Sequence, residues 1–226
     1  MGIDLRTELE ETGRLWIRRA LPEQDLIPLE QAAAAPHKPG VRLDWNDVFQ
    51  EKLGVNSRMA ELVGDVMPGS FPVRLVAFNK TPEANWSVPW HQDRVVAVAE
   101  QHDTDGFGNW SRKAGIWHAE PPIELLENML FARIHIDDTD EANGCLEIAQ
   151  GTHVFGLVPA HQATGMAEQA PREICRAHRG DVLLVKALTL HRSLSSASQL
   201  SRRALRVDYA NTALPPPLEW SVSMPA

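Results

Sequence analysis

The sequence has few of the features that mark secreted, membrane-spanning or nucleic-acid-binding proteins. Its 226 residues include two cysteines, too few for a disulfide framework, at a spacing that does not fit a zinc site. No apolar run approaches the ~20 residues of a membrane span, and the charged start of the chain does not resemble a signal peptide. Acidic residues outnumber basic ones by 30 to 22, which argues against nucleic acid because phosphate binding needs a basic surface. We therefore expect a cytoplasmic protein with no membrane, nucleic-acid or obligate protein partner.

The composition is that of one folded domain. Hydrophobic residues make up 43% of the chain and charged residues 23%, enough to bury a substantial core. We expect residues 1–226 to form a single domain whose first part, 1–40, is mostly helical. DLRTELEETG is helix-like and ends at Gly13, LWIRRAL is a candidate strand, and PEQDLIPLEQAAAA opens with proline and acids as a helix N-terminus does.

From about residue 71 the chain changes to short apolar runs separated by turn residues. Asn143-Gly144 is a strong hairpin signal, and Gly180-Asp181 marks a further turn before a strand. Many short strands with turns favour a mainly β fold of the jelly-roll kind, with its core in residues 71–210. Residues 100–128 show no clear strand pattern, and a connection of that length is often a lid or binding loop.

VPWHQDR, residues 88–94, places an imidazole and a carboxylate two positions apart. In a strand His91 and Asp93 would point to the same face. A His-x-Asp pair alone is a weak indication of a metal site, so a third ligand is needed. His191 is the candidate, because it ends the strand-like run DVLLVKALTLH, in which alternation places it on the face of Leu183 and Val185. Two histidines and one carboxylate form the facial triad of non-haem iron(II) oxygenases.

Three segments carry a resemblance to a known family. NKTPEANWSVPWHQD (79–93), NGCLEIAQGTHVFG (143–156) and HRSLSSASQLSRRALRVDYA (191–210) resemble the phytanoyl-CoA dioxygenase family of iron(II)- and 2-oxoglutarate-dependent oxygenases, in order and in spacing. The resemblance covers most of the chain from residue 14 to 210. It implies a double-stranded β-helix, a cupin-like jelly-roll barrel with N-terminal and flanking helices. It also implies that His91, Asp93 and His191 bind Fe(II), with 2-oxoglutarate and O2 as cosubstrates.

The resemblance further implies an arginine that binds the distal carboxylate of 2-oxoglutarate, for which the planar guanidinium fork is suited. Arg202, eleven positions after His191, matches that arginine. Arg203 competes, since strand alternation places it on the more apolar face, and the choice between the two stays open although the alignment favours Arg202. Ser193 matches a hydroxyl that assists the carboxylate, and Lys80 matches a basic residue near the cosubstrate.

Four further residues are candidates for substrate contact. Arg133 and His135 alternate with an apolar set in MLFARIHIDD, and an arginine that points into a barrel is costly unless it is paired. That face is therefore either solvated or holds an anionic substrate or cosubstrate. Trp110 and Lys113 lie in the 100–128 segment. That segment is either a solvated loop or a lid that contacts the substrate. Trp86 and Trp90 are better explained by core packing.

These observations predict an Fe(II)- and 2-oxoglutarate-dependent dioxygenase that hydroxylates an unactivated C–H bond and releases succinate and CO2. The substrate would be a small or mid-sized metabolite of unknown identity. Asp93 favours oxygenation over halogenation, because related halogenases carry a small residue at that place. Two other readings stay open: a cupin-like metal enzyme that does not use 2-oxoglutarate, and a non-catalytic jelly-roll binding protein.

Overall fold

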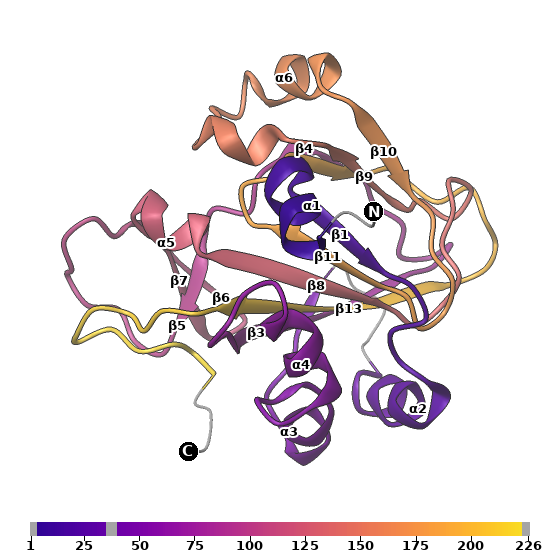
Figure 1. The fold of residues 1–226 in the computed structure, drawn as a ribbon, viewed down its shortest axis with the longest axis horizontal. Coiled ribbons are helices and arrows are strands. Elements are labelled where there is room, and N and C mark those ends of the chain that lie inside the picture. The colour runs from indigo at the N-terminus through magenta and orange to yellow at the C-terminus, as the bar shows by residue number, and fades with distance from the viewer. Residues whose placement is uncertain (1–3, 35–39, 223–226) are drawn as a thin grey trace.

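The protein is built around three antiparallel sheets, seen in a computed structural model that describes residues 4–34 and 40–222 (Figure 1). The six-stranded sheet has the order β1 (Arg14–Ile17), β11 (Val182–Lys186), β8 (Met129–His135), β13 (Arg202–Ala210), β3 (Phe71–Lys80) and β2 (Val41–Arg42). The four-stranded sheet has the order β10 (Arg172–Cys175), β9 (Leu146–Ala149), β12 (His191–Ser193) and β4 (Val88–His91). The three-stranded sheet consists of β5 (Val96–Val98), β7 (Ile116–Glu120) and β6 (Gly108–Lys113).

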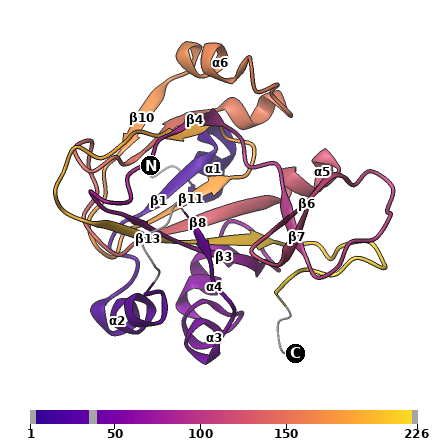
Figure 2. The ribbon, with the colours of Figure 1, turned by 180° about the vertical axis from the view of Figure 1, so that it is seen from behind.

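The two larger sheets lie over one another, and the third sheet lies at one end of the pair (Figures 1 and 2). The chain passes repeatedly between the two larger sheets, so that β8 belongs to one and β9 to the other. This arrangement confirms the predicted mainly β, jelly-roll architecture. The space between the sheets is where side chains from both can meet.

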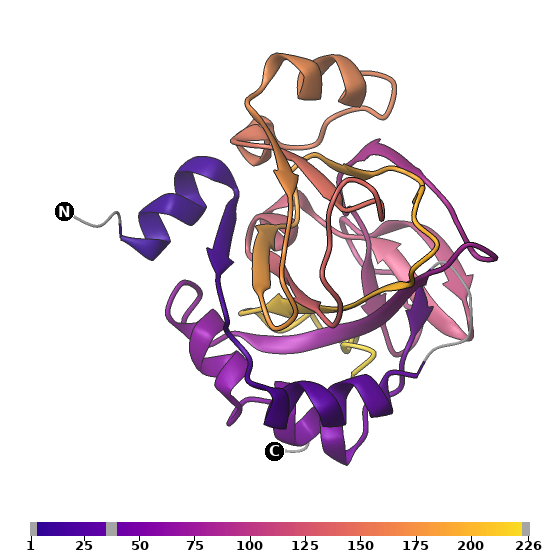
Figure 3. The ribbon, with the colours of Figure 1, turned by 90° about the vertical axis from the view of Figure 1, so that its right-hand side faces the viewer.

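The larger sheet is covered on both faces, so apolar residues are buried on both sides of its strands. Leu130, Ala132 and Ile134 of β8 pack in one buried cluster with residues of the N-terminal helices. The alternate residue Phe131 packs with Leu183 and the strands of the smaller sheet. Figure 3 shows the helices of residues 23–32 and 47–64 beneath the long strand β3, on the side away from the smaller sheet.

The described part of the chain also forms short helices: α1 (Leu5–Thr12), α2 (Glu23–Ala32), α3 (Asp47–Leu53), α4 (Arg58–Gly64), α5 (Ile123–Glu127), the 3-10 helix η1 (Thr152–Phe155) and α6 (Ala163–Gln169). Helix α1 ends where predicted, because Gly13 takes a left-handed conformation at φ 74° and its N–H bonds the Leu9 carbonyl. Asn46 and Ser57 cap α3 and α4 by accepting backbone N–H groups.

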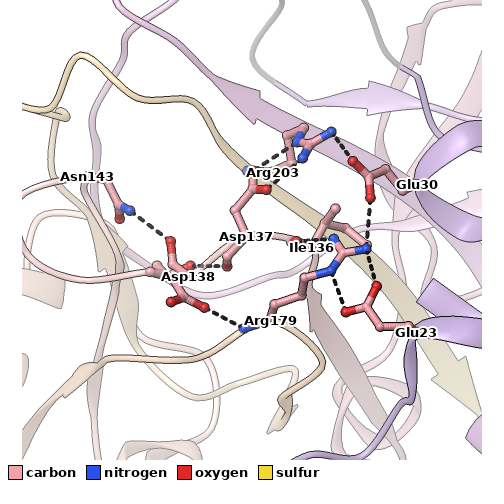
Figure 4. Close-up of polar contacts among 9 residues, drawn as sticks. Glu23, Glu30, Ile136, Asp137, Asp138, Asn143, Arg179 and Arg203 are labelled. Carbon is pink, nitrogen blue, oxygen red and sulfur yellow. Dashed lines mark hydrogen bonds and ion pairs between the residues drawn. The ribbon is translucent and has the colours of Figure 1, made fainter. Parts of the chain in front are cut away.

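Ion pairs attach α2 to one end of the larger sheet (Figure 4). Arg179 contacts both Glu23 and Glu30 of the helix, each at 2.9 Å. Arg203 of β13 contacts Glu30 at 2.5 Å and also donates to Asp137, at 2.7 Å. Arg203 is therefore held on the helical side of the sheet.

Three details of the sequence reading differ from the structure. Asn143-Gly144 is a turn, but β8 and β9 do not pair, so the turn joins two sheets and is not a hairpin. The run DVLLVKALTLH is not one strand, because β11 ends at Lys186 and the chain crosses to the other sheet before His191. Residues 100–128 contain β6, β7 and α5, where no strand pattern was recognised. Whether this segment is a lid stays a prediction.

No helix in the described part of the chain is long and apolar enough to cross a membrane.

Candidate metal centre

His91, Asp93 and His191 come together between the two larger sheets. His91 ends β4 and His191 begins β12, and the two residues are directly paired across these strands. Asp93 lies just beyond the end of β4, where its backbone N–H donates to the Ala187 carbonyl at 3.2 Å. One ligand atom from each residue lies within 4.8 Å of the others, as binding to a single metal ion requires.

Both histidines are oriented for metal binding by hydrogen bonds on the far side of the ring. Nδ1 of His91 donates to the Pro89 carbonyl and Nδ1 of His191 to the Thr189 carbonyl, each at 2.9 Å. Each ring then directs its Nε2 away from that carbonyl, which is the usual arrangement of metal-binding histidines. Burial, with the neighbouring His191, lowers the pKa of His91 to about 4, so this imidazole is neutral and can donate its lone pair.

Asp93 is held by a chain of buried charges. Arg206 of β13 donates from Nη1 to Asp93 Oδ2 at 2.7 Å and from Nε to Asp208 at 2.6 Å. Arg74 of β3 contacts the other oxygen of Asp208 at 2.5 Å. Burial alone would raise the pKa of Asp93, but Arg206 and His191 hold it well below its usual range. The carboxylate is thus ionised, as a metal ligand must be.

A cavity of about 80 Å³ lies beside the candidate metal ligands His91 and His191. Its wall includes the polar residues His91, His191, Ser193, Arg133, Arg202 and Arg206, and the apolar residues Phe78, Trp86, Phe131 and Leu146. The cavity therefore has the candidate metal centre at one side and cationic groups elsewhere on its wall. This donor set fits a small anion that also reaches the metal.

Arg202 is 2% exposed, and its Nε and Nη1 have no hydrogen-bond partner among the described residues. An unpaired buried guanidinium is costly, so these atoms indicate the place of an anionic ligand. Arg203, the competing residue, faces the helices and pairs with Asp137 and Glu30. The more apolar face of β13 is the one under the helices and not the one facing the cavity, which is why alternation favoured Arg203.

Lys80 and Ser193 lie beside Arg202 at the start of β13. Lys80 is directly opposite Arg202 in the strand pairing, and its Nζ donates to Ser193 Oγ at 3.1 Å and to the Leu194 carbonyl at 2.5 Å. Burial, together with Arg202 and Arg133, lowers the pKa of Lys80 to about 7. Ser193 Oγ donates onward to the Gly144 carbonyl at 3.0 Å, which joins the group to the Asn143-Gly144 turn.

The four candidate substrate residues divide into two pairs. Arg133 and His135 are buried on the face of β8 that is turned toward the smaller sheet, and Arg133 lines the cavity. Trp110 instead packs against the cluster of Val96 and Leu126, and Lys113 is exposed at the end of β6. Neither Trp110 nor Lys113 lines the cavity beside the metal centre. Trp86 lines it, whereas Trp90 packs in a separate core with Leu190.

Sequence reasoning missed Arg206 and Gln92. The spacing Arg202, Arg206, Asp208 along one strand face was visible, but its partners Asp93 and Arg74 come from distant segments. Gln92 lies between the two ligands of the HQD motif. Its amide donates to the Gly156 and Leu188 carbonyls and accepts from the Val158 N–H, and so fixes the loop that follows β9.

The fold and the His-Asp-His cluster define a metal-binding jelly-roll protein, and the sequence assigns it to a family. The phytanoyl-CoA dioxygenase family model matches residues 9–204, so the chain belongs to the phytanoyl-CoA dioxygenase family. No curated protein sequence matches the chain closely enough to count as a relative.

Solved structures share the fold at low sequence identity. AviO1 from Streptomyces viridochromogenes Tue57 is 19% identical with a TM-score of 0.66, and the match covers 94% of this chain and 96% of that one. The non-haem 2-oxoglutarate-dependent epimerase SnoN from nogalamycin biosynthesis is 15% identical with a TM-score of 0.67, covering 92% and 82%. HygX from Streptomyces hygroscopicus, solved with nickel, 2-oxoglutarate and hygromycin B, is 15% identical with a TM-score of 0.63, covering 94% and 88%.

Proposed function

We propose that the protein is an Fe(II)- and 2-oxoglutarate-dependent dioxygenase that oxidises an unactivated C–H bond of a small or mid-sized metabolite. One observation carries the proposal: His91, Asp93 and His191 converge beside a cavity whose wall also holds the unpaired guanidinium of Arg202. Membership of the phytanoyl-CoA dioxygenase family supports it. So do the 2-oxoglutarate and metal ions named for SnoN and HygX, which share the fold.

When bound, iron and 2-oxoglutarate supply the oxidising chemistry, with succinate and CO2 as by-products. The protein's own residues bind and orient. His91, Asp93 and His191 would hold the metal, and three protein ligands would leave coordination positions for the cosubstrate and O2. Arg202 receives the distal carboxylate, while Lys80 and Ser193 hold that end of the cavity in shape.

The apolar part of the wall keeps water away from the reacting centre. Phe78, Phe131 and Leu146 line the same cavity as the two metal-binding histidines. A dry cavity of this kind strengthens every electrostatic contact in it and limits side reactions. The retained carboxylate of Asp93 supports oxygenation over halogenation, since it fills the place that a halide would need.

Turnover of 2-oxoglutarate to succinate tests the proposal. Purified protein loaded with Fe(II) should convert 2-oxoglutarate to succinate in the presence of O2, even without its substrate, at a slow rate. Asp93→Ala should abolish this activity because it removes one of three metal ligands. Full retention of turnover in Asp93→Ala would remove Asp93 from the ligand set.

The outcome of the oxidation is a separate question, because SnoN is named an epimerase although it shares the fold and the cosubstrate. Hydroxylation places an oxygen atom from O2 in the product, whereas epimerisation does not. Once a substrate is found, incorporation of ¹⁸O from ¹⁸O2 into the product would support hydroxylation. A product of unchanged mass would contradict it.

Two other functions remain to be separated from this one by experiment. A cupin-like enzyme that does not use 2-oxoglutarate would bind iron but form no succinate, and Arg202→Ala would leave it active. A non-catalytic binding protein need hold no metal at all. Metal analysis of the purified protein, followed by the succinate assay, distinguishes the three.

A further inference from the structure

Arg133 is a buried cation without a fixed partner. The residue is 6% exposed, its Nε has no hydrogen-bond partner, and it forms no ion pair with any carboxylate in residues 4–34 and 40–222. Its guanidinium lies 5.4 Å from the ring centre of Phe78, which is a cation–π contact. Burial lowers the pKa of Arg133 to about 9, so the group is still charged at neutral pH. A buried charge of this kind is costly unless a ligand compensates it.

Four arginines line the cavity beside the candidate metal centre, and two of them are already neutralised. Arg192 contacts the carboxylate of Glu147. Arg206 contacts the carboxylates of Asp93 and Asp208. Arg133 and Arg202 have no such partner in the described structure, and both carry buried nitrogen atoms without hydrogen bonds. Two positive charges therefore face a cavity that offers no free carboxylate of its own.

Strand pairing places the two unpaired arginines on one face of the larger sheet. Arg133 of β8 is directly opposite Arg206 of β13, and Arg202 lies four residues before Arg206, on the same side of the strand. Ala204 lies between Arg202 and Arg206 on this side of the strand and pairs with His135 of β8. Arg133 and Arg202 thus approach the same end of the cavity from neighbouring strands.

The cavity is small. At about 80 Å³ it lies well below the roughly 300–1,000 Å³ of ordinary ligand pockets, which favours one small anion at this end over two separate ligands. We propose that Arg133 and Arg202 together bind the distal carboxylate of the 2-oxo acid cosubstrate, as a clamp of two arginines. This inference rests on the proposed function. A carboxylate can accept from both, because its two oxygens offer about four lone-pair sites.

A comparison of two ligands tests the clamp directly. 2-Oxopentanoate has the same carbon chain as 2-oxoglutarate, with a methyl group where the distal carboxylate would be. Dissociation constants of both are measured without O2 by calorimetry on the Ni(II)-loaded full-length protein. Arg133→Leu should raise the dissociation constant of 2-oxoglutarate by roughly 10- to 100-fold, which is the range for the loss of one charged hydrogen bond. It should change 2-oxopentanoate binding by less than about threefold, well below the loss of one such contact.

Variants of two kinds separate a binding role from a structural one. Arg133→Lys keeps the charge and should restore part of the affinity for 2-oxoglutarate, but not all, because lysine lacks the fork. Arg203→Leu is the matched control: Arg203 lies one position after Arg202, pairs outside the cavity, and should leave both ligands unchanged. Replacing an unpaired buried charge by leucine should not unfold the protein, and a thermal melt of each variant checks this.

The outcomes distinguish a failure of the two-arginine clamp from a failure of the proposed function. Unchanged affinity of Arg133→Leu for 2-oxoglutarate overturns the clamp, as does an equal loss for both ligands, which would show an effect on the cavity as a whole. A wild-type protein that binds Ni(II) but neither 2-oxo acid contradicts the proposed function itself. Selective loss of 2-oxoglutarate binding supports both.

Discussion

Each of the three candidate metal ligands is oriented by a hydrogen bond to a second residue. The histidine rings are fixed by backbone carbonyls two residues before them, which needs no particular neighbouring side chain. Asp93 differs, because its carboxylate is held by Arg206, a residue 113 positions away in the chain. The asymmetry makes Arg206 the side chain on which the geometry of the carboxylate ligand depends most.

Arg206→Lys should lower the affinity for Ni(II) by about 10- to 100-fold, the usual effect of removing a partner of a metal ligand. Lysine keeps the charge, but its single ammonium group cannot replace the two guanidinium nitrogens that contact Asp93 and Asp208. Isothermal titration with Ni(II) measures the effect. Arg203→Lys is the control, because its partners lie outside the site. Equal affinities of Arg206→Lys and wild type would contradict a positioning role for Arg206.

Several residues of the candidate site could be predicted from the sequence, and the reason is physical. His91 and Asp93 are two positions apart in the chain, so they lie close together whatever the rest of the fold does, although Asp93 lies just beyond the end of β4. His191 required the resemblance, because the alternation argument assumed one unbroken strand and β11 ends at Lys186. The spacing of Arg206 along its strand was visible, but its importance was not, because its partner Asp93 comes from a distant segment.

Among the elements, the turn at residues 143–144 links the smaller sheet to the cationic end of the cavity. Gly144 has φ 71°, and a Cβ atom there would lie 2.4 Å from the Leu194 carbonyl oxygen and 2.9 Å from Lys80 Nζ. The glycine is required both by the backbone conformation and by this close approach. The turn therefore positions the Gly144 carbonyl that accepts from Ser193.

Gly144→Ala should destabilise the protein by about 1–3 kcal/mol, through backbone strain and the clash with the Leu194 carbonyl. Urea unfolding measures this loss. Gly165→Ala is the matched control, because that glycine lies in α6 with no atom within 4 Å of the added methyl group. It should be neutral or stabilise the protein by up to about 1 kcal/mol. Equal stability of Gly144→Ala and wild type would contradict the account of the turn.

Element boundaries were predicted best where local chemistry decides them. Gly13 ends α1 because only a residue tolerant of positive φ fits there, and this can be read from the sequence. The strands β6 and β7 were missed, since GNWSRK and IWHAE lack strict alternation and form through their mutual pairing. The Asn143-Gly144 turn was recognised as a turn, but no local rule shows that its flanking strands enter different sheets.

For the whole molecule, buried neutral histidines make stability depend on pH. His118 is fully buried, and burial, with Arg42 and Arg74 nearby, lowers its pKa to about 4. His135 is also fully buried, and burial, with Arg133, lowers its pKa to about 3. In the unfolded chain both take up a proton near pH 6.5. The stabilisation is therefore present above pH 6.5 and is lost as the pH falls toward 4 and 3.

The metal-free protein should lose stability as the pH is lowered from 6.5 to 4, by up to about 1.4 kcal/mol per pH unit for each such histidine. The midpoint of urea unfolding, followed across this range, measures the slope. His118→Gln should flatten it, because glutamine does not titrate. His178→Gln, at a side chain that is 85% exposed, should leave the slope unchanged. A slope of His118→Gln as steep as that of wild type would contradict the argument.

The overall architecture followed from the sequence because many short strands with turns admit few arrangements. What did not follow was the covering of the larger sheet on both faces. That covering turns the apolar side of β13 toward the helices and leaves Arg202 and Arg206 facing the cavity. A strand whose two sides are both buried does not reveal by alternation which side faces the ligand.

The most direct test of the central claim is a titration of the metal-free protein with Fe(II) and 2-oxoglutarate without O2, followed by visible absorption. A weak charge-transfer band forms only when both bind one iron. The account predicts that the band appears in the wild type, is absent in Asp93→Ala, and is lost or much weakened in Arg202→Ala. Iron binding without the band in the wild type would contradict a 2-oxoglutarate-dependent centre, and a protein that binds no iron would contradict the metal centre itself.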